Sequence, residues 1–83
     1  MTKIIEDIEG IVLSKVKEVL ETEDDIEINQ NLGSLGLDSI RSIGLIADIE
    51  CEFDITFDDD ELLMHNFSTI EKIVQRVHHK LEY

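Results

Sequence analysis

The sequence has almost no cysteine, few basic residues and no long hydrophobic run. Cys51 is the only cysteine, so no disulfide can form within the chain, which fits a reducing compartment. No run of about 18 apolar residues exists, so we expect no membrane-spanning segment. The first residues reach Glu6 and Asp7 without a long apolar core, which excludes a signal peptide. These absences predict a cytoplasmic protein.

The shortage of basic residues determines which partners the chain attracts. Lysine and arginine number 7 against 20 acidic residues, which gives a formal net charge of -13. Such a chain repels nucleic acid and anionic membrane surfaces, so we expect neither as a partner. Its macromolecular partners are instead expected to present basic patches.

The length of 83 residues predicts one small domain over residues 1–83, because no internal repeat and no linker divides the chain. A domain of this size buries about 60% of its unfolded surface, which leaves little room for a deep catalytic pocket. Hydrophobic residues make up 42% of the chain and charged residues 33%, a balance typical of a folded soluble domain.

Hydrophobic periodicity predicts an all-α fold, a small antiparallel bundle of three main helices plus one short helix. Apolar spacings of three and four predict main helices over residues 3–21, 39–53 and 68–81. Acidic residues favour a short helix over residues 58–64, because they stabilise a helix N-terminus. The second main helix is expected to bury Ile43, Leu45, Ile46, Ile49 and Phe53, and the last to bury Ile70, Ile73, Val74, Val77 and Leu81.

Residues 22–37 break the helical period and predict a long ordered loop between the first two main helices. Ile26 and Ile28 alternate with polar residues, which suggests a short strand. A structureless stretch of this length in a small domain is often functional. The apolar residues expected to pin this loop to the core are Ile26, Ile28, Leu32, Leu35 and Leu37.

Capping residues open two of the predicted helices. Asp38 or Ser39 supplies the N-cap of the second main helix, directly after a loop that contains Gly36. Ser68 and Glu71 form a capping box for the last helix. A serine at a helix start is in most proteins no more than a cap, so Ser39 needs further context.

The segment Gly36-Leu37-Asp38-Ser39-Ile40 resembles the attachment motif of acyl carrier and peptidyl carrier proteins, which centres on Asp-Ser followed by Leu or Ile. Other features also occur in the order that is typical of this family, namely the predicted helices, Phe53-Asp54-Ile55 and Asn66-Phe67-Ser68-Thr69-Ile70. The resemblance therefore covers nearly the whole chain. It implies that a phosphopantetheinyl transferase attaches 4′-phosphopantetheine from coenzyme A to Ser39. The thiol of that arm would carry an acyl or aminoacyl group as a thioester between enzymes. Met1 and the lack of a linker favour a discrete protein.

Elementary physics is compatible with this resemblance. A phosphodiester is an anion, and the N-terminus of a helix is a favourable place for one. A tethered thioester meets the active site of a partner at a high effective concentration. Asp38 is expected either to cap the helix or to be recognised by the transferase.

The second main helix is the predicted docking element, because it begins at Ser39. At helical spacing Ile40, Gly44, Ala47 and Cys51 form one stripe, beside the predicted buried stripe. This stripe is either a docking surface or a peripheral part of the core, and Cys51 is interpreted as a small apolar filler. The candidate partner-binding residues are Asp38, Ile40, Arg41, Gly44, Ala47 and Cys51.

The charge of this helix bears on the pathway. The family commonly presents acids there, whereas here the acids are confined to Asp48, Glu50 and Glu52. This departure favours polyketide or nonribosomal peptide secondary metabolism over bulk fatty-acid synthesis. The expected partners of the monomeric chain are the transferase, an acyl- or aminoacyl-loading enzyme, and a downstream acyltransferase, synthase or tailoring enzyme.

Catalytic and metal-binding functions find little support in the sequence. A nucleophilic serine needs an oriented base, whereas His65, His78 and His79 are interpreted as ordinary surface residues. The chain is therefore expected to be a substrate of enzymes and not an enzyme. A calcium loop starting at Asp54 lacks the required glycine and glutamate, so no metal site is predicted. Two alternatives stay open: an unmodified acidic adaptor that binds a basic protein, and a weakly calcium-responsive helical module.

Overall fold

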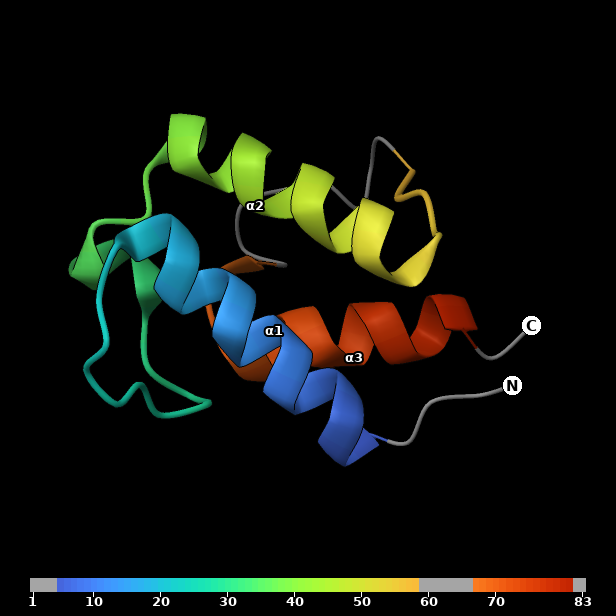
Figure 1. Cartoon of the computed structure of the whole chain (residues 1–83), viewed down its shortest axis with the longest axis horizontal. Coiled ribbons are helices and arrows are strands. Elements are labelled where there is room, and N and C mark those ends of the chain that lie inside the picture. The colour runs from blue at the N-terminus through green and yellow to red at the C-terminus, as the bar shows by residue number, and fades with distance from the viewer. Residues whose placement is uncertain (1–4, 59–66, 82–83) are drawn as a thin grey trace.

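The computed structural model describes residues 5–58 and 67–81, which form a three-helix bundle without a strand in the described ranges. Helix α1 spans Ile5–Leu20, α2 spans Ser39–Phe53 and α3 spans Ile70–Leu81. Helix α1 packs against both other helices and runs in the opposite direction to them (Figure 1). The predicted all-α class is thus confirmed.

The predicted helix boundaries agree with the structure to within two residues. Helix α2 has the predicted bounds, α1 ends one residue early, and α3 begins two residues late. The predicted short helix over residues 58–64 lies outside the described residues, except for Asp58, which is not helical. None of the described helices has the length and hydropathy needed to cross a bilayer.

The hydrophobic core is shared by the three helices and the segments between them. Phe57 and Phe67, which flank the undescribed segment, meet edge to face with ring centroids 5.4 Å apart and planes at 83°. Such aromatic pairs contribute about 1 kcal/mol beyond their buried area. The other buried apolar residues are Ile8, Val12, Val16, Ile26, Leu32, Leu37, Leu45, Ile49, Phe53, Ile70, Ile73, Val74 and Val77.

The buried stripe of α2 differs from the predicted one. Ile43, predicted to be buried, is 69% exposed, while Ser42 is only 2% exposed. The buried residues follow spacings of three and four from Ser42, and Ile43 lies about 100° around the helix from that line. Packing of α2 against α1 and the rest of the core therefore selects the stripe that contains a serine, and the prediction for Ile43 is wrong.

The loop between α1 and α2 contains no strand but a short 3-10 helix, η1, over Leu32–Leu35. Ile26, Leu32 and Leu37 are buried as predicted, whereas Ile28 and Leu35 are 40% and 39% exposed. The loop is held by backbone hydrogen bonds to the start of α3 and not by strand pairing. The Leu32 N–H donates to the Ser68 carbonyl, and the Glu71 N–H donates to the Ile28 carbonyl, each at 2.8 Å.

The N-terminus of α3 is capped by Thr69. Its hydroxyl oxygen accepts a hydrogen bond from the Lys72 N–H at 3.1 Å. The predicted capping box would have used the Glu71 N–H, which instead donates to the loop carbonyl of Ile28. Because the Glu71 N–H is used in this contact with the loop, the cap of α3 is Thr69, one residue after the predicted Ser68.

Candidate functional site

The loop before α2 is shaped to present the start of that helix at the surface. Gly36 ends η1 with φ at 106°, a left-handed conformation that glycine adopts without steric cost. The next residue, Leu37, is buried and anchors the loop in the core. Asp38 and Ser39 follow as exposed residues. This path fixes the N-terminus of α2 while leaving it open to solvent.

Asp38, and not Ser39, caps α2. The Asp38 carboxylate accepts a hydrogen bond from the Arg41 N–H at 2.8 Å, and its carbonyl accepts one from the Ser42 N–H at 2.9 Å. The Ser39 hydroxyl makes no hydrogen bond with any described residue, and the first two N–H groups of the helix, on Ser39 and Ile40, are likewise without a partner there. The serine is thus left available for chemistry.

These features fit the attachment of a phosphodiester at Ser39. The hydroxyl is exposed, and two adjacent N–H groups point from the positive end of a helix of 15 residues. The anion nearest to Ser39 along the chain is the Asp38 carboxylate, which already accepts a hydrogen bond from the Arg41 N–H.

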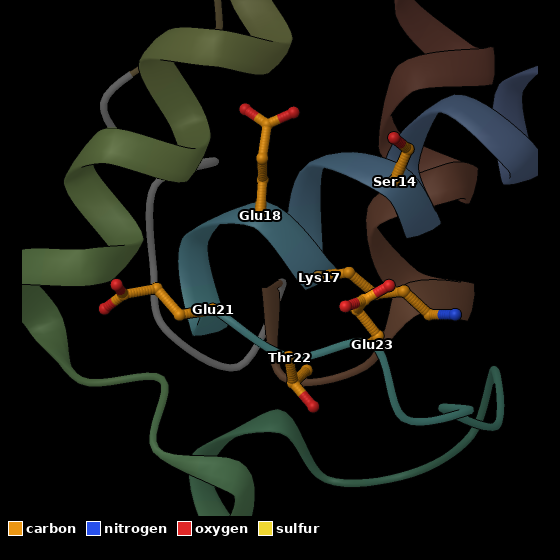
Figure 2. Close-up of a pocket in the computed structure, with 6 residues that line it drawn as sticks. All are labelled: Ser14, Lys17, Glu18, Glu21, Thr22 and Glu23. Carbon is orange, nitrogen blue, oxygen red and sulfur yellow. The ribbon is translucent and has the colours of Figure 1, made fainter.

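The Arg41 side chain contacts the end of α1. Its Nη1 donates to the Val19 carbonyl at 3.1 Å, and its Nη2 lies 3.9 Å from the Glu21 carboxylate. Figure 2 shows the Glu21 side chain directed toward α2. The guanidinium therefore joins α2 to the carboxyl end of α1, where a cation is favoured.

The predicted docking stripe is fully exposed. Ile40 is 79% exposed, Ala47 and Cys51 are exposed, and a Cβ added at Gly44 would meet no heavy atom within 4 Å. The stripe lies about 180° around α2 from the buried residues, because a helix turns by about 100° per residue. The interpretation of this stripe as peripheral core is therefore wrong, and so is that of Cys51 as a core filler.

A shallow pocket of about 500 Å³ lies at the carboxyl end of α1 (Figure 2). Three carboxylates line it, together with the negative end of the helix dipole, so it disfavours a phosphate group. Its one cation, Lys17, lies 4.0 Å from the Asp25 carboxylate. This pocket does not extend the Ser39 site. Its lining residues are Ser14, Lys17, Glu18, Glu21, Thr22 and Glu23.

The described histidines do not form a catalytic pair with Ser39. His78 and His79 lie on α3 and line a different pocket, to which α2 contributes no residue. His65 and most of the acidic segment 58–61 lie outside the described residues. Within residues 5–58 and 67–81, no three histidine, cysteine or acidic side chains are grouped so that they could hold a metal ion.

Comparisons with known proteins converge on one family. A family model described as a phosphopantetheine attachment site matches residues 10–77. An acyl carrier protein homolog from Mycoplasma genitalium is 32% identical over 72 residues, which cover 80% of this chain and 83% of that protein. Among solved structures, the chain resembles a chain in the crystal structure of the Bradyrhizobium japonicum glycine:carrier protein ligase complexed with glycylated carrier protein. That likeness has a TM-score of 0.71 and 28% identity, and covers 86% of this chain and 97% of the other.

Proposed function

Because the chain belongs to the phosphopantetheine attachment family, whose members carry covalent 4′-phosphopantetheine, we propose that Ser39 holds this cofactor. The exposed Ser39 hydroxyl at the uncovered N-terminus of α2 carries the proposal. A separate phosphopantetheinyl transferase attaches the arm from coenzyme A. The arm supplies a thiol that holds cargo as a thioester.

The proposed role of the chain is to hold an acyl or aminoacyl group and present it to successive enzymes. The likeness to an acyl carrier protein homolog supports acyl cargo, and the likeness to a structure with a glycylated carrier protein supports aminoacyl cargo. The chain itself is a non-catalytic, cytoplasmic substrate of other enzymes in this proposal. Within the described residues the Ser39 hydroxyl has no hydrogen bond to a base that could activate it. Its pathway belongs to polyketide or nonribosomal peptide secondary metabolism.

The proposed docking surface for these enzymes is the exposed face of α2. Ile40, Gly44, Ala47 and Cys51 form it, and the structure adds Ile43, which sequence analysis assigned to the core. Because Arg41 contacts α1, the first two turns of this face are apolar and neutral. A loading enzyme that binds this surface presents an apolar patch to the first two turns of α2. It also presents basic side chains that pair with Asp48 further along the helix.

Intact mass spectrometry tests the attachment residue. The chain is incubated with coenzyme A, Mg²⁺ and a broad-range transferase, and we expect a gain of one phosphopantetheine. Ser39→Ala should show no gain, whereas Ser14→Ala, which removes another exposed serine on α1, should gain the arm normally. An unchanged mass of the wild-type chain with several transferases would favour the unmodified adaptor instead.

A further inference from the structure

A second groove lies between α1, α3 and the loop that precedes η1. It measures about 400 Å³, and one face of α3 supplies most of its lining at helical spacings of three and four. Helix α1 and the loop each add one residue, while α2 adds none. The lining residues are Glu9, Ile28, Glu71, Val74, Gln75, His78 and His79.

The groove contains an exposed apolar side chain that is held in place. Ile28 is 40% exposed, although isoleucine is among the residues most often buried. Its carbonyl accepts the Glu71 N–H at 2.8 Å, which fixes the loop against the first turn of α3. Val74 also lines the groove but is only 5% exposed, so Ile28 supplies most of the apolar surface there. The groove thus offers an apolar side chain whose backbone is hydrogen-bonded to α3.

Two carboxylates in the lining have no counterion within residues 5–58 and 67–81. Neither Glu9 nor Glu71 forms an ion pair or a side-chain hydrogen bond with any described residue. The whole chain carries a net charge of -13, so its field adds to the attraction of these two groups for a cation. The same field repels a second copy of the chain, a nucleic acid or an anionic lipid surface.

We propose that this α1–α3 groove docks a segment of a partner protein in which an apolar side chain stands beside a lysine or arginine. The aliphatic stem of a basic side chain packs on Ile28, while its charged end lies beside Glu9 and Glu71. The apolar neighbour in the partner segment covers the exposed part of Ile28. Charge complementarity and the uncovered isoleucine both select this occupant.

The placement of the groove gives it a use distinct from the Ser39 site. Because no residue of α2 lines it, a partner held there leaves the exposed face of α2 uncovered. A carrier held in this way presents its α2 face to a neighbouring active site at a raised effective concentration. Binding in the groove does not depend on Ser39 or on its cofactor, so the two proposals stand or fall separately.

A titration followed by ¹H–¹⁵N NMR tests the groove. The full chain, labelled with ¹⁵N, is titrated with a short acetylated peptide of leucine and lysine at moderate salt. We expect amide shift changes confined to the groove residues of α3 and to Ile28 and its neighbours. A peptide with serine in place of each leucine should bind about tenfold more weakly, because it loses the apolar contact.

Matched variants separate the groove from general attraction to an acidic protein. Ile28→Ser should weaken the binding of the leucine–lysine peptide about fivefold to tenfold. Leu35→Ser, which removes an equally exposed apolar side chain in η1, should leave it unchanged. Glu71→Lys should weaken binding more than Glu23→Lys, which makes the same charge change outside the groove. Circular dichroism confirms the fold of each variant.

Four results would overturn the proposal. Shift changes spread evenly over the acidic surface would indicate nonspecific attraction, as would equal weakening by Glu71→Lys and Glu23→Lys. Shift changes confined to α2 would move the interaction to the docking surface already described. Equal affinity of the leucine–lysine and serine–lysine peptides would remove the apolar contact on which the groove depends.

Discussion

Ser42 places a hydroxyl in the hydrophobic core of the bundle, one turn after Ser39. Its Oγ is buried and has no hydrogen-bond partner among the described residues. A buried hydroxyl in this situation loses its hydration without replacement, at a cost of about 1–3 kcal/mol. This position therefore weakens the fold directly beneath the site.

We expect Ser42→Ala to raise the free energy of unfolding by about 1 kcal/mol, because the orphaned hydroxyl is removed and alanine favours the helix. Urea unfolding followed by circular dichroism measures this as a higher midpoint at an unchanged m value. Ser14→Ala on the exposed face of α1 serves as the control, with a change within about 0.5 kcal/mol. A lower midpoint for Ser42→Ala would show that a buried water satisfies the hydroxyl.

At the scale of the element, α2 has two opposite faces with separate tasks. One face packs Leu45, Ile49 and Phe53 into the core, while the other exposes Ile40 and Gly44 to solvent. A change on the exposed face can therefore alter docking without disturbing the packing. Gly44 is the most informative position, because a side chain there meets open space.

Gly44→Ala is expected to stabilise the chain by up to about 1 kcal/mol, since alanine has the higher helix propensity. Gly44→Glu should fold and accept the arm on Ser39, but lose loading by the cognate acylating enzyme, whose apolar surface would face a carboxylate. The measurements are the rates of arm attachment and of loading, with circular dichroism as the folding control.

Gly10→Glu provides the matched control for this prediction, because Gly10 also has open space around its Cα and lies on α1. It adds the same bulk and charge away from the docking surface, so loading should proceed at the wild-type rate. Equal loading rates for Gly44→Glu and wild type would contradict docking on this face of α2.

At the scale of the whole molecule, charge of one sign opposes the compact state. Acidic residues outnumber lysine and arginine by 20 to 7. The ion pairs that offset this excess are surface pairs, such as Lys15–Glu52 at 3.6 Å and Lys80–Asp58 at 3.5 Å. Such pairs contribute only about 0–1 kcal/mol each, so much of the repulsion remains.

Added salt or millimolar Mg²⁺ should therefore raise the thermal midpoint at pH 7, because both screen the repulsion between carboxylates. Differential scanning calorimetry at increasing NaCl, with a parallel series at increasing Mg²⁺, measures the effect. A midpoint that responds to neither would mean that the lysines and arginines already neutralise the acidic clusters.

The amino-acid sequence by itself determined the three main helices, the family and the start of α2. These features depend on local signals: apolar spacing within one helix, an Asp at the N-cap, and a short motif around Ser39. Because each signal acts within a few residues of chain, it needs no knowledge of the neighbouring helices. The bounds Ser39–Phe53 were predictable for this reason.

Only the tertiary structure decided which of several neighbouring residues in a segment has its side chain buried. In α2, hydropathy favours Ile43 over Ser42, yet the packing of the helix against α1 and the rest of the core buries the serine. In the loop, the backbone hydrogen bond between Ile28 and Glu71 moves the α3 cap to Thr69 and leaves the Ile28 side chain exposed. Such choices arise from contacts between segments far apart in the chain, and the period of a single segment does not encode them.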